Sequence, residues 1–230
     1  LDKPKVKSEL QEDSSQVSNP SSDDSSKPSD DCPYGKCSGD GFLHKEVDGF
    51  WTSTTCECIR DKGKIRLLGD RFYRVKLGDI EPRSPKQAKL KGALLAHPDR
   101  SVFLYGAGGS GKTHFLAAMY NFWDGRRKKI KYYEDGTLRD ELQNAKLNND
   151  YSFAATIVKD YECLFIEDVG KEAMSDVYRS GLYRIFNEAY KHRRYIFITS
   201  NDPLRILGQD EYWGAHVARR VEDLCQIVEF

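Results

Sequence analysis

The sequence GAGGSGKT, residues 106–113, decides how the rest of the chain is interpreted. Its glycines allow backbone N–H groups to turn inward around phosphate oxygens, where larger side chains would obstruct them. Lys112 is long enough to reach the β- and γ-phosphates, and Thr113 offers a hydroxyl to Mg²⁺ at the start of a helix whose positive end faces the phosphates. The apolar run VFLY precedes the loop and a helical pattern follows it. We therefore predict a strand–loop–helix unit that binds and hydrolyses a nucleoside triphosphate, rather than a chance match in a glycine-rich loop. The predicted phosphate-binding residues are Gly106, Ala107, Gly108, Gly109, Ser110, Gly111, Lys112 and Thr113.

Apolar runs alternate with helical patterns on both sides of this loop. We predict strands at 102–105, 130–133, 163–166, 195–199 and 226–230. We predict helices at 85–96, 113–123, 137–145, 151–159, 175–192 and 217–224. Short apolar strands that alternate with helices are typical of a parallel sheet covered on both faces, so the predicted fold class is α/β. The apolar residues between 72 and 80 are expected to form a short strand or docking arm.

Two adjacent carboxylates, Glu167 and Asp168, follow the apolar run LFI. A strand that ends in this way delivers one carboxylate to the Mg²⁺ shell and the other to the attacking water. We assign Glu167 to magnesium by its position and Asp168 to water activation. The usual order is Asp first, so the division of roles between the two acids stays open. An ordinary acidic loop after a strand is the alternative interpretation.

Two more candidate sites lie near the last predicted strands. Asn201 closes the segment ITSN, where its amide is placed to bond both a phosphate and the attacking water; a turn-forming Asn before Asp202-Pro203 is the alternative. Arg219 and Arg220 precede the final strand, and a guanidinium there can stabilise a phosphoryl group bound by a neighbouring subunit. From the residues alone, a solvated helix end is the favoured interpretation of the two arginines.

Four of the six cysteines cluster in the spacing C-x₄-C-x₁₈-C-x-C, at Cys32, Cys37, Cys56 and Cys58. Two pairs of close thiolates separated by a loop suit tetrahedral Zn²⁺. The sequence shows no secretory signal, which favours metal binding over disulfides. The segment is too short and glycine-rich for an apolar core, so a metal is expected to stabilise it. Reduced cysteines without a metal are the alternative, and His44 is a substitute ligand unless it is simply an exposed histidine.

The sequence divides into four parts of different composition. Residues 1–31 are polar and net acidic with almost no apolar side chains, which predicts a disordered tail. We expect a zinc-binding module at 32–60, a linker at 61–98 and a nucleotide-hydrolysing domain at 99–230. The formal net charge of the chain is zero, so only a local patch would contact nucleic acid. No apolar run approaches the ~18 residues that a membrane helix needs.

Two basic runs, RRKKIK at 126–131 and KHRR at 191–194, are candidate contacts for the phosphates of single-stranded DNA. Tyr132, Tyr133 and Tyr195 follow these runs and are available to stack on bases. Each run also precedes a predicted strand, where solvated charge is ordinary, and that alternative stays open.

Five segments together resemble one family: GAGGSGKTH, LFIEDVG, LYRIFNEAY, FITSN and the late RR pair. They are similar to the DnaC/DnaI-type helicase loaders of the AAA+ ATPases and to the related IstB transposition helpers. The resemblance covers roughly residues 72–230. In addition, CPYGKCSGDGF followed by CEC resembles the zinc-binding segment ahead of the ATPase in some loaders, with two extra residues between the first two cysteines.

The resemblance implies a role for each matching residue. The matches are Lys112 and Thr113 for the Walker A pair, Glu167 and Asp168 for the Walker B acids, Asn201 for sensor 1, and Arg220 for an arginine finger that acts in trans. His114, directly after the loop, is typical of the group and is added to the nucleotide-binding residues. Arg219 stands where the group usually has Ser, and Ala189 stands where it often has Arg before the Tyr.

The resemblance also implies a function. The chain is expected to load the replicative hexameric helicase onto single-stranded DNA in the cytoplasm, with ATP, Mg²⁺ and Zn²⁺ as cofactors and with self-association through the ATPase domain. No C-terminal helical lid is expected, so hydrolysis by the lone protein should be weak. An IstB-like helper of a transposase, acting on duplex DNA, is the first alternative. A zinc-anchored adaptor that does not hydrolyse ATP is the second, because the order of Glu167 and Asp168 is reversed.

Overall fold

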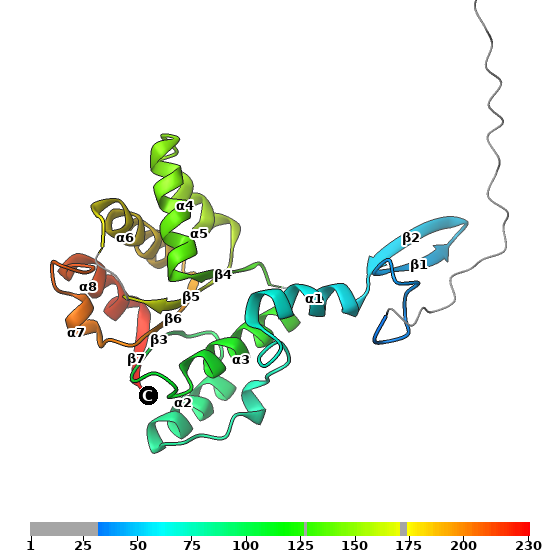
Figure 1. The fold of residues 1–230 in the computed structure, drawn as a ribbon, viewed down its shortest axis with the longest axis horizontal. Coiled ribbons are helices and arrows are strands. Elements are labelled where there is room, and N and C mark those ends of the chain that lie inside the picture. Colours follow the sequence, from blue (N-terminus) through cyan, green and yellow to red (C-terminus); the bar gives the residue numbers. More distant parts are fainter. Residues whose placement is uncertain (1–31, 127, 171–173) are drawn as a thin grey trace, which may run out of the picture. The chain divides into compact units, whose positions relative to one another are not determined.

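A computed structural model of the chain describes residues 32–126, 128–170 and 174–230 (Figure 1). The chain divides into two compact units, one up to Arg60 and one from Asp61 onward. The predicted acidic tail at 1–31, and one residue of the first basic run, lie outside the described residues. No helix in the described part of the chain combines the length and the apolar composition that a membrane crossing requires.

The smaller unit contains an antiparallel hairpin of β1 (Phe42–Val47) and β2 (Phe50–Thr55). Asp48 and Gly49 form its turn with φ values of 54° and 80°, which is the two-residue turn that Asp-Gly favours. The four cysteines flank the hairpin, two before β1 and two after β2. Helix α1 (Glu57–Leu68) begins directly after Cys56.

The larger unit is built on a five-stranded sheet in the order β4-β5-β6-β3-β7, and every neighbouring pair is parallel. The strands are β3 (Ser101–Tyr105), β4 (Ile130–Glu134), β5 (Cys163–Val169), β6 (Tyr195–Ser200) and β7 (Cys225–Glu229). All five predicted strands are therefore present, and β5 runs three residues further than predicted. Because the strands are parallel, their carboxyl ends meet at one edge, where polar residues from different strands come together.

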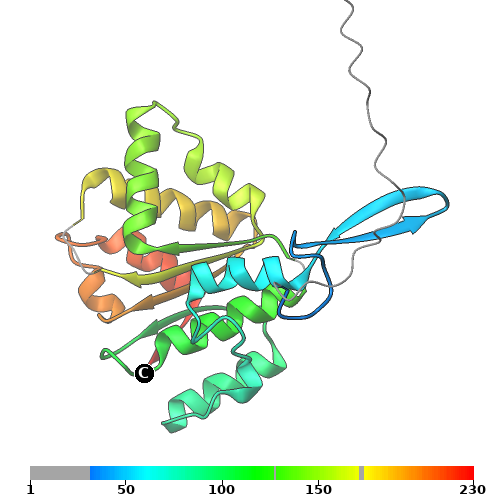
Figure 2. The same ribbon diagram turned by 45° about the vertical axis from the view of Figure 1, so that its right-hand side comes forward.

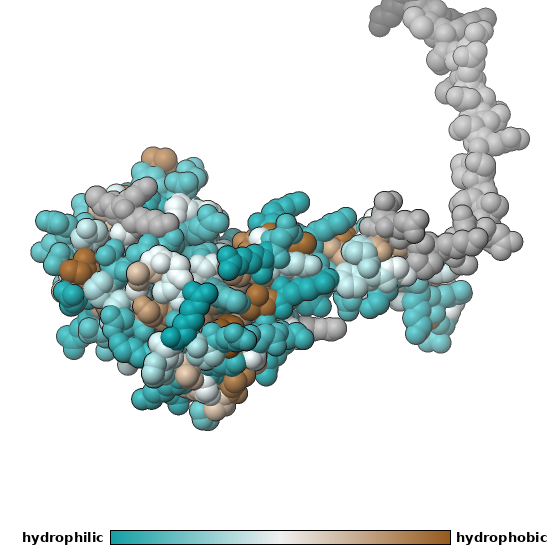
Figure 3. Space-filling view, turned by 60° about the horizontal axis from the view of Figure 1, so that its bottom comes forward, coloured by the Kyte–Doolittle hydropathy of each residue, from teal (hydrophilic) through white to brown (hydrophobic). Residues whose placement is uncertain are grey.

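Helices cover both faces of this sheet, as Figures 1 and 2 show. One apolar cluster joins one face to side chains of α4 (Asp135–Leu147), α5 (Phe153–Asp160), α6 (Asp176–Lys191) and α8 (Ala215–Leu224). A second cluster joins the other face to α2 (Pro85–Ala96) and α3 (Lys112–Gly125). The short α7 (Leu204–Leu207) packs with the first cluster and was not predicted. On the face seen in Figure 3, apolar residues lie in small separate areas among hydrophilic ones.

The segment 72–80 forms turns and a short 3₁₀ helix, η1 (Leu77–Asp79), so the first of the two predictions for it, a strand, is wrong. Leu77 and Ile80 are buried in the cluster that contains α2 and α3. The Asn121 amide donates to the carbonyl oxygens of Phe72 and Val75, both at 3.0 Å. A side chain of α3 thus satisfies backbone acceptors that would otherwise need a neighbouring strand.

Candidate functional site

The predicted phosphate-binding loop links the carboxyl end of β3 to the first turn of α3. Gly111 ends the loop with φ at 104°, a left-handed conformation that a side chain would strain, and α3 begins at the next residue. Lys112 is 7% exposed, and its Nζ donates to the carbonyls of Gly106 at 2.7 Å and Ala107 at 2.9 Å. The ammonium therefore sits at the centre of the loop, where it can meet an anion.

The donor set and the space around the loop fit a triphosphate. A Cβ atom placed on Gly108, Gly109 or Gly111 would meet no atom within 4 Å, so these positions leave the loop open to a ligand. The loop also opens a helix of 14 residues whose N-cap makes no side-chain hydrogen bond, which leaves N–H groups for phosphate oxygens. Thr113, at the second position of this helix, is partly exposed.

Three of the predicted site residues form one hydrogen-bonded chain. Lys112 Nζ donates to Asn201 Oδ1 at 3.1 Å, and Asn201 Nδ2 donates to Asp168 Oδ1 at 3.2 Å. Asp168 has φ at 62° and lies in a bulge of β5 between Ile166 and Val169. Its backbone N–H donates to Thr199 Oγ1 at 2.9 Å on the neighbouring strand, which holds this unusual conformation in place.

Glu167 has a partner that the sequence analysis missed. The Tyr132 hydroxyl, from β4, donates to Glu167 Oε2. Tyr132 is 8% exposed, and burial raises the pKa of its hydroxyl, as does the charge of Glu167, so the phenol remains a proton donor. The predicted stacking of Tyr132 and Tyr133 on bases is wrong, because both rings are buried against the core.

Helix α2 supports the loop from outside the motif. Gln87 is 4% exposed, and its Nε2 donates to the Ser110 carbonyl at 3.0 Å while its Oε1 accepts from the Arg83 backbone at 2.7 Å. Arg83 NH1 donates to the Gly109 carbonyl at 3.3 Å. Ser84 caps α2 through a 3.2 Å bond from Gln87 N, which fixes the start of this helix. The only sequence signal for this support was Ser84 before Pro85, which marks a helix start and not a contact.

A pocket of about 370 Å³ adjoins the loop. Residues 79–83, together with Gln87, Ser110, Gly111, His114 and Phe115, line it. His114 packs its ring against Phe72, with 5.6 Å between the ring centroids. Burial lowers the pKa of His114, and the nearby charges of Arg71 and Arg83 lower it further, so the imidazole is neutral at pH 7. The pocket therefore offers a neutral ring and an arginine beside the phosphate-binding loop.

Arg220 lies away from this group of residues. Its NH1 donates to Asp223 Oδ2 at 3.1 Å, and its guanidinium lies 5.3 Å from the centre of the Tyr190 ring. Tyr190 and Asp223 line a second pocket, of about 620 Å³, with residues that begin β3, β6 and β7. These are the amino ends of the strands, whereas the loop follows a carboxyl end, so the structure does not bring Arg220 to the chain's own phosphate-binding loop.

The four clustered cysteines are brought together in the smaller unit. Their Sγ atoms lie within 4.8 Å of one another, with Cys32 and Cys56 at 3.8 Å and Cys37 and Cys58 at 3.6 Å. Four thiolates around one tetrahedral Zn²⁺ stand roughly 3.8 Å apart, so this donor set fits zinc. The distances are far too long for disulfide bonds.

The environment of the cysteines differs from one thiol to the next. The backbone N–H groups of Lys36 and Cys37 lower the pKa of Cys32 to about 6, whereas burial and the neighbouring thiols raise the pKa of Cys58 to about 12. His44 bonds Asp40 Oδ2 at 2.9 Å and Ser53 Oγ at 3.0 Å, so both ring nitrogens are engaged outside the cysteine cluster.

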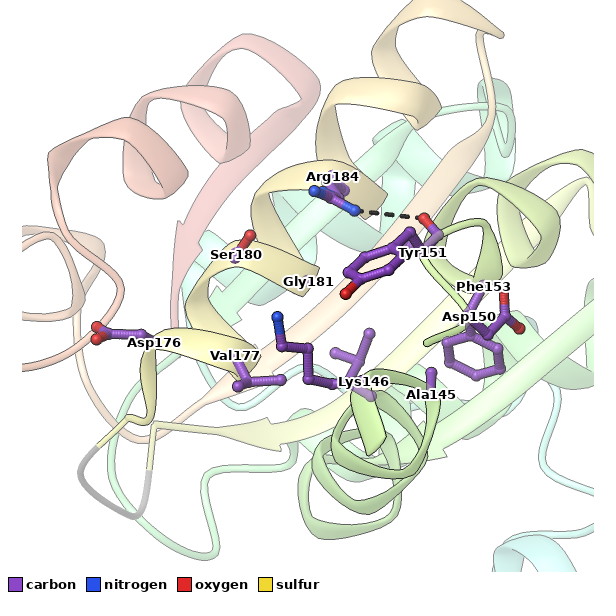
Figure 4. A pocket seen from close by; sticks show the side chains of 12 residues that line it. Ala145, Lys146, Asp150, Tyr151, Phe153, Asp176, Val177, Ser180, Gly181 and Arg184 are labelled. Atoms are coloured by element: carbon purple, nitrogen blue, oxygen red, sulfur yellow. Dashed lines mark hydrogen bonds between the residues drawn. The ribbon is translucent and has the colours of Figure 1, made fainter. Parts of the chain in front are cut away.

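A third pocket, of about 220 Å³, lies between α4, α5 and α6 and has a largely apolar lining (Figure 4). Lys146 and Arg184 stand at its rim on either side of Tyr151. Arg184 NH1 donates to the Tyr151 carbonyl at 3.3 Å, and Lys146 Nζ lies 5.3 Å from the centre of the Tyr151 ring. None of the predicted site residues lines this pocket.

Comparison with known proteins agrees with this geometry. Residues 79–229 match the family described as IstB-like ATP binding protein. The chain is 27% identical over 106 residues to the chromosomal replication initiator protein DnaA of Clavibacter sepedonicus, covering 44% of this chain and 22% of that protein. It is 26% identical over 125 residues to DnaA of Neisseria gonorrhoeae, covering 52% of this chain and 24% of that protein. The chain thus spans less than a quarter of the length of these curated relatives.

Solved structures of low sequence identity share the fold. A DnaC helicase loader gives a TM-score of 0.60 at 18% identity, covering 70% of this chain and 99% of that chain. DnaI gives 0.59 at 22% identity, covering 71% and 92%. AMPPCP-bound DnaA from Aquifex aeolicus gives 0.57 at 21% identity, covering 68% and 50%. The predicted α/β class with a P-loop core is confirmed.

Proposed function

The chain belongs to the family of IstB-like ATP-binding proteins, and from this premise we propose that it is an ATPase of replication initiation that loads the replicative helicase onto single-stranded DNA. The observation that carries the nucleotide-dependent part is the chain of hydrogen bonds from Lys112 through Asn201 to Asp168. It joins a phosphate-binding cation, a polar relay and a carboxylate, which are the parts that phosphoryl transfer requires. The DnaC and DnaI folds support the loader role.

Each residue of the site has a role in this proposal. Bound Mg²⁺–ATP supplies the phosphoryl group, and the metal ion offsets its negative charge. The loop N–H groups and Lys112 bind the phosphates, while Thr113 and Glu167 hold the magnesium. Asp168 orients the attacking water, with Asn201 as its hydrogen-bond partner. The pocket with His114 and Arg83 receives the base or ribose.

Arg220 completes a neighbouring copy's site in this proposal. Its contacts with Tyr190 and Asp223 hold it at the amino ends of the strands, out of reach of its own loop. From that place a guanidinium would reach a nucleotide across an interface between copies. Hydrolysis should therefore be weak for the lone chain and rise when copies assemble, so that ATP acts as a switch.

The smaller unit, which contains the four clustered cysteines, is the proposed binding site for the helicase. Zn²⁺ held by the four cysteines would stabilise the base of the hairpin, whose far end exposes Phe50 (76%) and Trp51 (69%). Residues 1–60 carry twelve acidic and seven basic side chains, a balance that repels a phosphate backbone and favours a protein partner. In this proposal 1–31 is a tail, 32–60 the zinc module and 99–230 the ATPase domain. The predicted linker at 61–98 packs with that domain, because it lies in the larger unit and its helix α2 belongs to the apolar cluster beside the sheet.

Single-stranded DNA is the proposed nucleic-acid partner. Arg193 and Arg194 of the second basic run line the pocket at the amino ends of the strands, together with Arg100 and the exposed ring of Tyr190. Cations beside an exposed aromatic ring are the groups that bind single strands. Replication by a complex of this kind takes place in the cytoplasm, which is where we place the protein.

The family match also favours a second candidate function, an IstB-like helper of a transposase. A third reading, an adaptor that binds ATP without hydrolysing it, draws on the reversed order of Glu167 and Asp168. The test is to mix the full chain, ATP and Mg²⁺ with the replicative helicase from the same genome and to measure complex mass by light scattering after size exclusion. A stable complex supports the loader. Assembly on duplex DNA without a helicase complex supports the transposition helper.

A further inference from the structure

The register between β4 and β5 brings a tyrosine to one of the two acids. Tyr132 pairs with Phe165, and Glu134 pairs with Glu167. Side chains alternate between faces along a strand, so Tyr132 and Glu167 lie on the same face of the sheet. The phenol is long enough to reach diagonally across the two strands, and its hydroxyl donates to Glu167 Oε2.

Packing fixes the position of this hydroxyl. The Tyr132 ring stacks on Phe165, with centroids 6.3 Å apart and planes inclined by 15°. Tyr120 of α3 meets it edge-on, with centroids 5.8 Å apart. Helix α3 begins at Lys112, so the donor to Glu167 is packed against the helix that carries the phosphate-binding lysine.

Glu167 needs such a restraint more than an aspartate would. Its side chain has one more methylene and one more rotatable bond, so ordering its carboxylate costs more conformational entropy. Glu134 pairs directly with Glu167 across the two strands, and Asp168 follows Glu167 in β5. Both neighbours carry the same charge as Glu167, and like charges at neighbouring positions repel its carboxylate. A hydrogen bond from a fixed hydroxyl to Oε2 offsets both effects and leaves Oε1 for a metal ion.

We propose that Tyr132 is a positioning residue that holds Glu167 as a magnesium ligand, and that this tether lets a glutamate serve where the usual acid is aspartate. The inference rests on the proposed nucleotide binding and on the roles proposed for the two acids, and it goes beyond them by naming the residue that positions Glu167. Tyr132 restrains Glu167 for the metal ion. Asp168 bonds Asn201 instead and keeps the proposed role of orienting the water.

The experiment measures how binding of a fluorescent, non-hydrolysable ATP analogue to the full chain depends on Mg²⁺. Tyr132→Phe keeps the ring and removes the hydroxyl, so the Mg²⁺ concentration for half-maximal effect should rise about ten-fold, the size of one hydrogen bond to a charged group. Binding measured in EDTA should not change. The matched control is Tyr133→Phe, which removes a buried hydroxyl that donates to Glu141 and should leave the Mg²⁺ dependence as it is.

A second pair of variants tests the tether itself. Glu167→Asp shortens the acid beyond the reach of the hydroxyl, so adding Tyr132→Phe to that variant should change the Mg²⁺ dependence less than about two-fold. A purely structural role for Tyr132 would give the same change in both backgrounds and would overturn the proposal. Thermal unfolding of each variant checks that it folds.

The outcomes separate this proposal from the proposed function. If the unmodified chain binds the analogue with Mg²⁺ and Tyr132→Phe behaves identically, the positioning role is wrong and the nucleotide site stands. An equal shift in Tyr133→Phe also overturns the positioning role. If the unmodified chain binds no analogue, both proposals fall.

Discussion

The Lys112 ammonium donates to the Asn201 side chain at 3.1 Å, although the two residues stand 89 positions apart in the sequence. The parallel sheet makes this contact, because β3 and β6 are neighbours and both end at the same edge. A residue of the phosphate-binding loop and a residue after β6 are therefore held together before any ligand is considered.

Lys112→Ala should weaken nucleotide binding by about 100-fold, since it removes a charged donor from the centre of the loop. Titration with a fluorescent ATP analogue measures the effect. Lys191→Ala is the matched control, because Lys191 is an exposed lysine at the end of α6 that forms an ion pair with Glu188. Nucleotide affinity that survives Lys112→Ala would contradict the assignment of the loop.

Arg220→Ala should lower hydrolysis by assembled copies by about 10³-fold, the loss typical of an arginine finger. Arg219→Ala is the control, since Arg219 is the residue next to Arg220 and its side chain is exposed. Mixing the two variant proteins tests the role in trans. The Arg220→Ala protein keeps an intact phosphate-binding loop, and the Lys112→Ala protein keeps Arg220. In an equal mixture, about a quarter of the head-to-tail interfaces place an intact loop of one copy against the intact Arg220 of the next. Hydrolysis should therefore return toward about a quarter of the activity of the unmodified protein. No recovery on mixing would argue against action across an interface.

Features made by residues close together in the sequence could be predicted, whereas contacts between residues distant in the sequence could not. The loop could be predicted because its residues are consecutive and their spacing alone specifies the geometry. The strands could be predicted from apolar runs, but β5 continues through Glu167 and Asp168, whose charge masked the last part of the strand. The hairpin was missed although Asp48-Gly49 is its turn signal, because the segment was interpreted only as a metal-binding module without an apolar core.

Other contacts had no local signal. Tyr132 reaches Glu167 only because of the register between β4 and β5, and a sequence does not state a register. Gln87 holds Ser110 across 23 positions, and nothing in the pattern of α2 distinguishes this glutamine from a solvated one. For the same reason Arg83 could not be connected with the loop before the fold was known.

Removing the metal should unfold the smaller unit and leave the larger one intact. A chelator would strip the proposed zinc ion from the four cysteines, and the glycine-rich segment has no apolar core to replace it. Thiol reactivity should then rise at Cys32, Cys37, Cys56 and Cys58, while Cys163 and Cys225 stay protected in the core of the larger unit. Nucleotide binding by the same sample, measured after the chelator is removed and Mg²⁺ is restored, should not change. Loss of that binding on chelation would mean that the two units depend on each other.

Phe50→Ser with Trp51→Ser should abolish binding to the helicase without unfolding the hairpin. Both side chains are exposed and lie at the turn, away from the cysteines, so their loss removes apolar contact area and little intramolecular packing. Thr52→Ser with Ser53→Thr is the control in the same strand. Light scattering of the mixture with helicase, and zinc content of the variant, give the result. A complex of unchanged stability would show that the helicase binds at another surface of the chain.

Two helical glycines should respond to alanine in opposite directions. Gly181 of α6 lines the pocket of Figure 4, and a Cβ there would stand 2.7 Å from both Leu142 methyl carbons of α4. A Cβ on Gly92 of α2 would meet nothing within 4 Å. Gly92→Ala should raise the free energy of unfolding by about 0.5–1 kcal/mol through helix propensity alone. Gly181→Ala gains the same propensity, but overpacking costs about 1–3 kcal/mol, so it should lower the free energy of unfolding by about 1 kcal/mol. Denaturant unfolding of the two variants measures both signs, and stabilisation by Gly181→Ala would show that α4 and α6 are not packed as closely as Leu142 indicates.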